Sequence, residues 1–388
     1  MRIAISTLVT PSQKSGIGNY VVNLIHALQE VDTENSYFIL IGSDTRHLFP
    51  LHAPNFFPVY LPFGHDPRWL MRPSYYAWQN SLAGILLRHK RIEVLHLPNL
   101  LPLFVRFVPT IVTIPDLSER KVAKYGRLRQ AYRSAIVPFI ARRASRLITI
   151  SENSKQELVG LGYAPASRID VTYLASAIST APPADPEAID RLRHKHGLAD
   201  DYVLYVGKLL AHKNLERLIE AFALLRRRHA IPHHLVLAGP SQGDVERLVH
   251  VAKQRGVTDR VHLLGYVVDE ELPLLYAGAA VFAFPSLSEG FGLPVLEAMA
   301  CGTPVVTSNT SSLPEVAGDA AVFVDPVSIE AIADGIWSVL ADDSLRRSLV
   351  AKGVERAARF TWQRCAEQTL EAYRRTVDNS QSGTGLAI

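Results

Sequence analysis

Short apolar runs recur along the whole chain, and each one is followed by a longer polar or amphipathic segment. Residues 2–7 read RIAIST, residues 202–208 read YVLYVGK and residues 281–286 read VFAFPS. Apolar runs of this length without strict alternation are typical of parallel strands that helices cover on both faces. The rhythm therefore predicts an α/β fold of doubly wound parallel sheets, whose ligands gather at the carboxyl ends of the strands. The further runs that fit lie at residues 37–42, 93–98, 110–116, 145–151, 234–239, 261–266, 304–308 and 320–326.

The length of the chain, 388 residues, is too great for one ordinary hydrophobic core and indicates two domains. Residues 175–187 are small and rich in proline, as is typical of a linker. The predicted divisions are an N-terminal domain at 1–174, a linker at 175–188, a C-terminal domain at 189–359, a last helix at 360–377 and a flexible tail at 378–388.

The composition excludes several classes of protein. Hydrophobic residues make up 48% of the chain and charged residues 20%, which allows sizeable cores and excludes a disordered chain. The net charge of +4 indicates mild attraction to anions, and without a recognised binding motif it does not predict nucleic acid as a partner. Cys301 and Cys365 give neither a disulfide framework nor a metal cluster. Because the N-terminus lacks signal-peptide features and no uncharged apolar run is long enough for a bilayer, we expect a cytoplasmic protein.

The stretch at residues 282–308 reads FAFPSLSEGFGLPVLEAMACGTPVVTS and joins two predicted strands. Between them lies a loop with Gly290 and Gly292, and then a helix that Pro294 marks near its first position. The unpaired backbone N–H groups at a helix N-terminus attract phosphate, and glycine permits a close approach to the backbone. The stretch therefore predicts an anion site at the end of a strand.

Two carboxylates flank this loop, Glu289 before it and Glu297 within the helix. A carboxylate accepts two hydrogen bonds from a vicinal diol, so the pair suits a ligand with a phosphate between two hydroxylated rings. A nucleotide sugar has this layout. Taken singly, each glutamate is explained as well by a solvated position, and the glycines by a simple turn.

Lys208 and Lys213 follow the first predicted strand of the second domain, in the segment GKLLAHKN. A cation at the carboxyl end of a strand, facing the helix that begins near Gly292, would bind a diphosphate and stabilise the charge on a departing nucleoside diphosphate. The alternative is that both are surface lysines without a ligand, which is the usual position of lysine.

The first domain offers a second glycine loop. Gly16 and Gly18 lie between the first predicted strand and a helix, which again suits an anion. The third glycine of the dinucleotide fingerprint is missing, so the support for an NAD site is weak. His96 and Asp116 lie at the ends of later strands, where ligands of such sheets gather.

Residues 120–146 are basic and contain no acid, with apolar residues such as Ile136 and Ile140 between the charges. A basic amphipathic segment can lie on an anionic membrane surface and make a peripheral membrane contact. A solvated helix face that acids elsewhere balance explains the segment equally well. Its basic residues are Arg120, Lys121, Lys124, Arg127, Arg129, Arg133, Arg142, Arg143 and Arg146.

The combined pattern, E-x7-E around G-F-G and then A-C-G-T-P, resembles the signature of the retaining glycosyltransferases of family 4. The resemblance covers nearly the whole chain. It implies the GT-B fold, two Rossmann-like doubly wound domains that face a central cleft, with an acceptor-side N-terminal domain and a nucleotide-sugar-binding C-terminal domain. It also implies that the last helix, which begins near Trp362, crosses back to the N-terminal domain.

The resemblance assigns roles to residues by position. It implies that Glu297 holds the ribose hydroxyls of the donor. The implied catalytic residues are Glu289, Lys208, Lys213 and Asp116. The other implied donor-binding residues are Gly290, Phe291, Gly292, Leu293, Gly265, Tyr266, Val267, Gly239, Gly16 and Gly18, and the implied acceptor-side residues are Asn19, His96 and Asp116.

Two positions depart from the family pattern. Lys208 replaces the arginine that is commoner there, and Pro115 stands where many members have a histidine near the reacting sugar. Asp116 is retained beside Pro115, and His96 at a neighbouring strand end is the residue that could partly substitute for the histidine.

These features predict a hexosyltransferase that acts on a nucleoside-diphosphate sugar and a hydroxyl of a glycan or lipid-linked saccharide, with retention of configuration. The first-domain loop and the IPDLS segment resemble bacterial surface-polysaccharide enzymes, which favours GDP-mannose as donor, with a UDP-sugar as the alternative. No metal or other cofactor is implied, because no acidic D-x-D pair ends a strand and the lysines supply positive charge. If the basic segment contacts lipid, the protein works at the inner face of the cytoplasmic membrane.

Other functions remain open. One is a sugar-nucleotide epimerase or a phosphorylase on the same scaffold, although neither a cofactor lysine nor a free-phosphate site stands out. Another is a catalytically inactive nucleotide-sugar-binding subunit of a glycan assembly complex. Pro115 supports that reading, and the presence of Glu289, Glu297 and both lysines opposes it.

Overall fold

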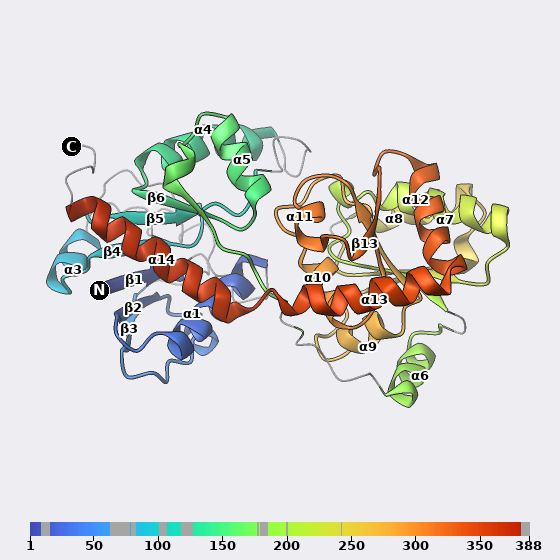
Figure 1. Ribbon diagram of the computed structural model, residues 1–388, viewed down its shortest axis with the longest axis horizontal. Helices are drawn as coiled ribbons and strands as arrows, with labels where there is room; N and C mark the ends of the chain where they lie inside the picture. The colour runs from blue at the N-terminus through green and yellow to red at the C-terminus, as the bar shows by residue number, and fades with distance from the viewer. Residues whose placement is uncertain are drawn as a thin grey trace. The chain divides into compact units, whose positions relative to one another are not determined.

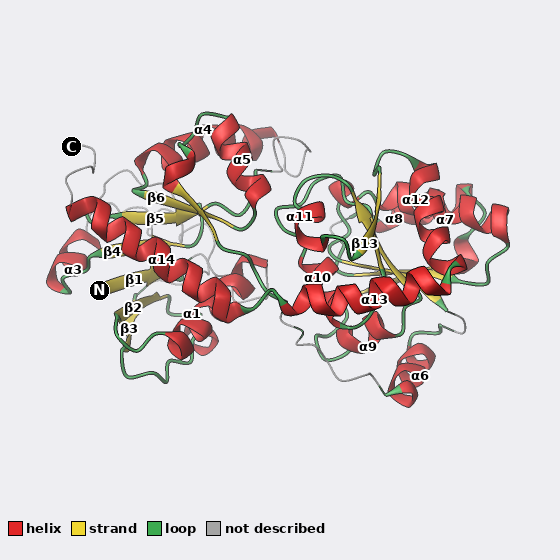
Figure 2. Cartoon of the chain, in the orientation of Figure 1, coloured by secondary structure: helices red, strands yellow, loops and turns green. Residues whose placement is uncertain are grey.

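The computed structural model describes residues 1–8, 16–62, 78, 83–100, 107–117, 127–176, 178, 185–198, 201–241 and 243–381, and the side chains of these residues except 127–133 and 381. The described chain separates into two compact units. The first contains the described residues up to Leu117, those from 127 to Leu174 and those from Thr361 onwards; the second contains those from Ala175 to Phe360. Each unit is built on one parallel sheet flanked by helices (Figure 2).

The sheet of the first unit is parallel throughout, in the order β3-β2-β1-β4-β5-β6-β7. All residues of β4, β5 and β6 are buried, which explains why their sequences read as apolar runs without alternation. Because β1 pairs with both β2 and β4, the direction of winding reverses between β1 and β4 (Figure 1). The strands are β1 (Arg2–Ser6), β2 (Ser36–Ile41), β3 (Phe56–Tyr60), β4 (Val94–Leu97), β5 (Thr110–Thr113), β6 (Arg146–Thr149) and β7 (Ile169–Val171).

The sheet of the second unit is also parallel, in the order β10-β9-β8-β11-β12-β13. Its central strands β8, β9, β11 and β12 are buried along their whole length. The winding reverses between β8 and β11, which are direct neighbours. The strands are β8 (Tyr202–Val206), β9 (His234–Ala238), β10 (Val261–Gly265), β11 (Val281–Phe284), β12 (Val305–Ser308) and β13 (Ala321–Val324).

The helices connect successive strands or flank the sheets. Those of the first unit are α1 (Gly16–Val31), α3 (Ala83–His89), α4 (Arg127–Arg143), α5 (Glu152–Gly160) and α14 (Trp362–Gln381), with 3-10 turns at Arg46–Leu48 and Ala166–Arg168. Those of the second unit are α6 (Pro186–Lys195), α7 (Leu215–His229), α8 (Val245–Gln254), α9 (Leu272–Ala277), α10 (Leu293–Ala300), α11 (Leu313–Ala317), α12 (Ile329–Ala341) and α13 (Asp343–Ala358), with 3-10 turns at Ala211–Lys213 and Thr258–Arg260. Among the described helices, none is long and apolar enough to cross a membrane.

The predicted fold class, two doubly wound parallel sheets, is confirmed. The sequence prediction did not include the strands β3 and β7 or the helices α3, α6, α11 and α13. β3 is an edge strand with mostly exposed or half-exposed residues, and β7 has three residues, so neither forms a long apolar run. Two expected boundaries also shift, because α6 begins at Pro186 within the expected linker and α14 continues to Gln381 within the expected tail. Residues 382–388 of that tail lie outside the described residues.

The last helix belongs to the first unit. α14 packs along α1 and lies against β4, β5 and β6 (Figure 1). Its inner face includes Cys365 and Tyr373, both fully buried. Arg375 on the same helix pairs with Asp170 on β7, with 2.9 Å between Nη1 and Oδ1. The chain end is therefore needed to complete the core of the unit that the chain start builds.

The residues of the basic segment at 120–146 have different surroundings in the structure. Residues 120–126 lie outside the described residues. Further on, Ile140 on α4 is fully buried in the core of the first unit. Arg146 begins β6, is buried, and places Nη1 2.8 Å from Oδ2 of Asp170, so it is an internal structural residue and not one that can meet lipid. Arg142 and Arg143 at the end of α4 are exposed.

His96 lies inside the first unit. Its ring is fully buried on β4, with Nδ1 2.8 Å from the hydroxyl of Tyr373 and Nε2 2.9 Å from the hydroxyl of Thr113. Burial lowers the pKa of His96 to about 3, so the imidazole is neutral at physiological pH. The expected acceptor-side role does not fit this position, because both ring nitrogens are occupied by neighbours in the core.

The buried His96 predicts a pH-dependent stability. Its pKa is about 3 in the fold and about 6.5 in the unfolded chain, so only the unfolded chain is protonated between these values. The stability that depends on neutral His96 is fully present above about pH 6.5 and is lost as the pH falls towards 3. We expect His96→Gln to reduce the slope of unfolding free energy against pH by up to about 1.4 kcal/mol per pH unit between pH 6 and 4, measured by urea unfolding.

A core variant on the same strand provides the control. Leu97→Ala, at a position that is 1% exposed, should lower stability by about 2–5 kcal/mol at every pH and leave the slope unchanged. Equal slopes for the natural protein and His96→Gln would contradict the prediction.

Candidate active site

The reversal of strand order in the second sheet creates the candidate site. β8 and β11 pair directly, with Val203 opposite Val281 and Leu204 opposite Phe282. Because both strands run in the same direction, the loops that follow them leave the same edge of the sheet. Ligands of doubly wound sheets bind at such a switch point, outside the carboxyl ends of the strands. The two loops contain the predicted residues Lys208, Lys213 and Glu289.

Lys213 and Glu289 form an ion pair across this switch point. The distance between Lys213 Nζ and Glu289 Oε1 is 2.5 Å, and the two side chains are 13% and 11% exposed. The ammonium also lies 5.0 Å from the ring centroid of Phe284, the last residue of β11. Because water screens a cation and a carboxylate little at this depth, the electrostatic attraction between them is strong.

The glycine loop after Glu289 is held by two serines from the segment before α11. The backbone N–H of Glu289 donates to Ser311 Oγ at 3.0 Å. The hydroxyl of Ser312 lies 3.1 Å from the carbonyl oxygen of Glu289 and 2.7 Å from that of Phe291. Gly292 has φ 121° and caps α10, and a Cβ at this position would lie 2.8 Å from Leu313 Cδ2. The loop therefore has one well-supported conformation, and the N-terminus of α10 opens beside it.

Glu297 lies one helical turn into α10 and is half-buried. The hydroxyl of Tyr276, at the end of α9, donates to Glu297 Oε2 at 2.8 Å. Burial raises the pKa of Glu297, and the hydrogen bond from Tyr276 opposes that shift. Burial and then the nearby Glu297 raise the pKa of Tyr276 well above its usual value, so the phenol keeps its proton and acts as the donor.

Three glycines bring the ends of β8, β9 and β10 close together. Gly207, Gly239 and Gly265 all have positive φ, at 149°, 139° and 69°. Gly239 donates its N–H to the carbonyl oxygen of Gly265 at 2.7 Å, and a Cβ on it would lie 2.0 Å from the carbonyl oxygen of Gly207. The contact between backbones thus requires glycine at 239 whether or not a ligand is bound.

The remaining predicted residues of the second unit lie around these strand ends. Lys208 is exposed directly after β8, and Tyr266 is 63% exposed after β10, with Val267 buried beside it. Leu293 is half-buried as the first residue of α10, and Gly290 is buried in the loop before it. The structure therefore brings the predicted catalytic and donor-binding residues of this unit to one edge of one sheet.

The predicted residues of the first unit lie at its own strand ends and first helix. Gly16 is the exposed first residue of α1, Gly18 is buried, and Asn19 is half-buried one residue further on. Asp116 is half-buried after β5. The carbonyl oxygen of Pro115, beside Asp116, lies 3.2 Å from the hydroxyl of Ser154.

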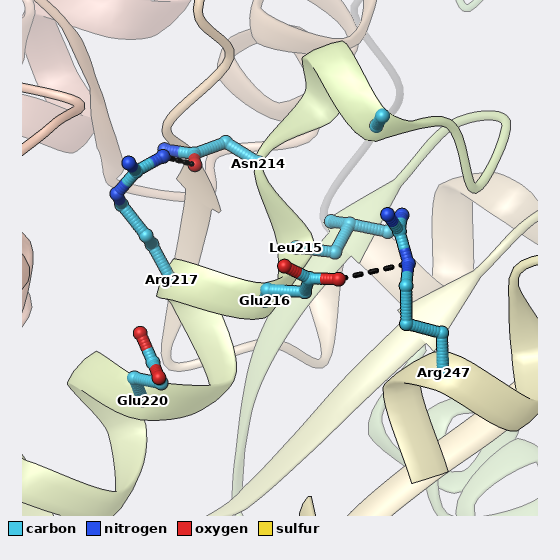
Figure 3. Close-up of a pocket in the computed structure, with 7 residues that line it drawn as sticks. Asn214, Leu215, Glu216, Arg217, Glu220 and Arg247 are labelled. Carbon is cyan, nitrogen blue, oxygen red and sulfur yellow. Dashed lines mark hydrogen bonds and ion pairs between the residues drawn. The ribbon is translucent and has the colours of Figure 1, made fainter. Parts of the chain in front are cut away.

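A polar pocket of about 230 Å³ lies beside the start of α7 (Figure 3). Within it Arg247 Nε pairs with Glu216 at 2.8 Å, and Arg217 donates to Asn214 Oδ1 at 2.9 Å. Asn214 has φ 64° and its amide also donates to the carbonyl oxygens of Pro285 and Pro326, at 3.0 and 2.6 Å. Glu220 in the pocket wall pairs with Arg255 outside it, at 2.6 Å. Asn214 holds the loop after β11 through the carbonyl oxygen of Pro285.

Sequence reasoning missed the supporting residues. Tyr276 reads as one apolar member of the segment LPLLYA. Asn214 is predicted as the cap of the following helix, and the structure does place it at the N-cap of α7, but its amide donates to the distant carbonyl oxygens of Pro285 and Pro326 and makes no capping hydrogen bond. Ser311 and Ser312 belong to a polar turn with no motif of its own. No local pattern marks these hydrogen bonds, because the two partners of each lie far apart along the chain. In the described part of the chain, no cluster of three His, Cys, Asp or Glu side chains could hold a metal ion.

Comparison with known proteins agrees with the geometry. Residues 188–356 match the family model for glycosyl transferases group 1, and residues 15–175 match that for a glycosyl transferase 4-like domain. An O-antigen chain mannosyltransferase B from Escherichia coli is 37% identical over 309 residues, which cover 79% of this chain and 78% of that protein. The chain belongs to the family 4 glycosyltransferases. A serotype-specific mannosyltransferase WbdA from Escherichia coli is 31% identical over 69% of this glycosyltransferase, but the match spans 33% of that longer protein.

Solved structures share the GT-B fold. A sucrose-phosphate synthase from Thermosynechococcus elongatus superposes with a TM-score of 0.75 at 23% identity, covering 96% of this chain and 98% of that one. The Anabaena protein HepE in complex with UDP and glucose gives 0.73 at 19% identity, covering 97% and 100%. At these identities the likeness concerns the fold of this glycosyltransferase.

The close approach of Gly239 to Gly207 predicts a large effect of a single methyl group. Gly239→Ala should lower the unfolding free energy by about 3 kcal/mol or more, because the Cβ overlaps a backbone carbonyl that cannot move without breaking the sheet. Gly160→Ala at the end of α5 is the matched control, since nothing lies within 4 Å of its Cβ position, and it should change stability by at most about 1 kcal/mol. Equal urea midpoints for the two variants would contradict this assignment.

Proposed function

We propose that this glycosyltransferase moves a mannosyl residue from GDP-mannose to a hydroxyl of a glycan or lipid-linked saccharide in surface-polysaccharide synthesis, with retention of configuration. The observation that carries the proposal is the 37% identity to an O-antigen chain mannosyltransferase over 79% of the chain. The name of that relative supports a mannosyl group as the one transferred. The resemblance in the first domain favours GDP over UDP as the nucleotide of the donor.

The donor would lie at the carboxyl edge of the second sheet. Glu297 on α10 would accept hydrogen bonds from the ribose diol, and Lys208 and Lys213 would bind the diphosphate. The N-terminus of α10 would add its unpaired N–H groups and dipole to the phosphate site. This placement of the donor is supported by the positions of all these groups, which follow β8 or β11 at one switch point.

The ion pair of Lys213 and Glu289 would exchange partners when the donor binds. At 2.5 Å the pair neutralises two groups that a nucleotide sugar needs separately. The diphosphate would compete for the ammonium and free Glu289 to accept hydrogen bonds from hydroxyls of the donor sugar. A site with its charges already paired avoids the cost of an isolated buried charge in the empty protein.

The reaction would need no covalent nucleophile. The bond between the anomeric carbon and the diphosphate oxygen breaks, and its electron pair leaves with GDP. The acceptor hydroxyl bonds to the anomeric carbon on the same face, and its proton passes to the departing phosphate oxygen. Lys208 and Lys213 would stabilise the negative charge that develops on the leaving group, which is the task that a metal performs in other transferases.

A lipid-linked acceptor would bring the protein to the inner face of the cytoplasmic membrane. Arg142 and Arg143 belong to this basic segment and are exposed at the end of α4. Arginines near an anionic surface each contribute on the order of 1 kcal/mol.

Nucleotide binding tests the donor site. We expect GDP to raise the melting temperature more than UDP or ADP, because ligand binding to the folded state adds to its stability. Lys208→Ala should weaken GDP binding by about 10- to 100-fold in calorimetry, the loss of one charge-assisted hydrogen bond to phosphate. Lys253→Ala, an exposed lysine on α8, is the charge-matched control and should bind GDP as the natural protein does. Failure of every nucleotide to bind would overturn the proposed function.

Turnover tests the chemistry. Purified protein with GDP-mannose and a mannose-containing acceptor should release GDP and form an α-linked product by NMR, with activity retained after EDTA treatment because the lysines supply the positive charge. Glu289→Gln should lower kcat by about 100-fold or more while GDP still binds. GDP binding without transfer or hydrolysis of any donor would favour an inactive nucleotide-sugar-binding subunit, and inversion at the anomeric carbon would overturn the proposed mechanism.

A further inference from the structure

Tyr276 makes a short side-chain hydrogen bond to Glu297, a predicted donor-binding residue. Tyr276 is fully buried, and its hydroxyl lies 2.8 Å from Glu297 Oε2. Glu297 is half-buried on α10, the next helix along the chain, which follows β11. A buried phenol that uses its single proton on a carboxylate fixes the position of that carboxylate oxygen.

The residues around Tyr276 hold it rigidly. Its ring packs edge-on against Phe282 of β11, with centroids 5.4 Å apart and planes at 67°. Its backbone carbonyl accepts a hydrogen bond from Thr303 Oγ1 at 2.7 Å. Tyr276 therefore cannot follow a moving glutamate, and Glu297 must adopt the rotamer that meets the phenol.

This contact leaves the other carboxylate oxygen, Oε1, for a ligand. A carboxylate has about four acceptor positions on its two oxygens, and a vicinal diol needs two of them at a defined spacing. A glutamate on a helix surface has several rotamers, and holding it in one of them removes an entropic cost from ligand binding.

We infer that Tyr276 is a positioning residue that sets recognition of the donor's ribose through Glu297. The inference rests on the proposed function, in which Glu297 binds the ribose diol. Tyr276 itself touches no ligand atom in this scheme, and its effect appears wherever the diol is present. The nucleobase, the diphosphate and the sugar are recognised by other groups.

A nucleotide without the diol separates this role from a structural one. We expect the natural protein to bind GDP at least about 10-fold more tightly than 2′,3′-dideoxy-GDP in calorimetry. Tyr276→Phe keeps the ring and its packing but removes the donor. It should weaken GDP binding about 10-fold and leave the affinity for 2′,3′-dideoxy-GDP unchanged.

Tyr202→Phe is the matched control. Tyr202 is an equally buried tyrosine of the same unit, and its hydroxyl donates to the backbone carbonyl of Leu275 at 2.7 Å, one residue before Tyr276. Its loss disturbs α9 without touching Glu297, so Tyr202→Phe should keep the full preference for GDP over 2′,3′-dideoxy-GDP.

A double-mutant cycle tests the route through Glu297. Glu297→Gln should lose most of the preference for the diol, and adding Tyr276→Phe should cause no further loss, since both changes remove one interaction. Additive losses would overturn the inference, as would equal weakening of both nucleotides by Tyr276→Phe. These outcomes differ from failure of the proposed function, in which the natural protein binds neither GDP nor UDP.

Discussion

The direct pairing of β8 with β11 is the constraint on which the candidate site depends. Consecutive pairing would have placed the loops after these strands at distant points of the sheet edge. The reversal of strand order instead brings Lys213 within 2.5 Å of Glu289 across 76 positions of sequence. Asn214 and Ser311 support the loop after β11, which contains Glu289, through hydrogen bonds to the carbonyl oxygen of Pro285 and from the backbone N–H of Glu289. The order of the strands thus brings the two opposite charges of the site together.

The two glutamates of the family signature have different environments, although they lie on one loop and helix. Glu289 pairs with the ammonium of Lys213, while Glu297 accepts a hydrogen bond from the neutral phenol of Tyr276. An ion pair can exchange its partner for a charged ligand, whereas a buried neutral donor keeps its acceptor in place. Under the proposed function, Glu289 would therefore meet the part of the donor where charge changes, and Glu297 the part that is only bound.

The first unit shows how burial changes the meaning of a polar residue. His96 lies at the end of an apolar run and Arg146 in a basic segment, and both suggested contact with ligands or lipid. In the fold, His96 joins β4 to α14 through Tyr373, and Arg146 joins β6 to β7 through Asp170. Both side chains satisfy hydrogen bonds between elements that are packed together, which is the usual condition for a polar group to be buried.

The sequence by itself determined the parallel α/β architecture, the strand ends that carry Lys208, Lys213 and Glu289, and the family, because apolar runs and the glutamate spacing are local features. The tertiary structure alone decided that Gly239 serves a backbone contact, that Tyr276 meets Glu297 and that His96 is internal. Local pattern fixes which residues are apolar and where strands end. It does not fix which distant side chain completes a hydrogen bond, since that depends on how strands are ordered and helices packed.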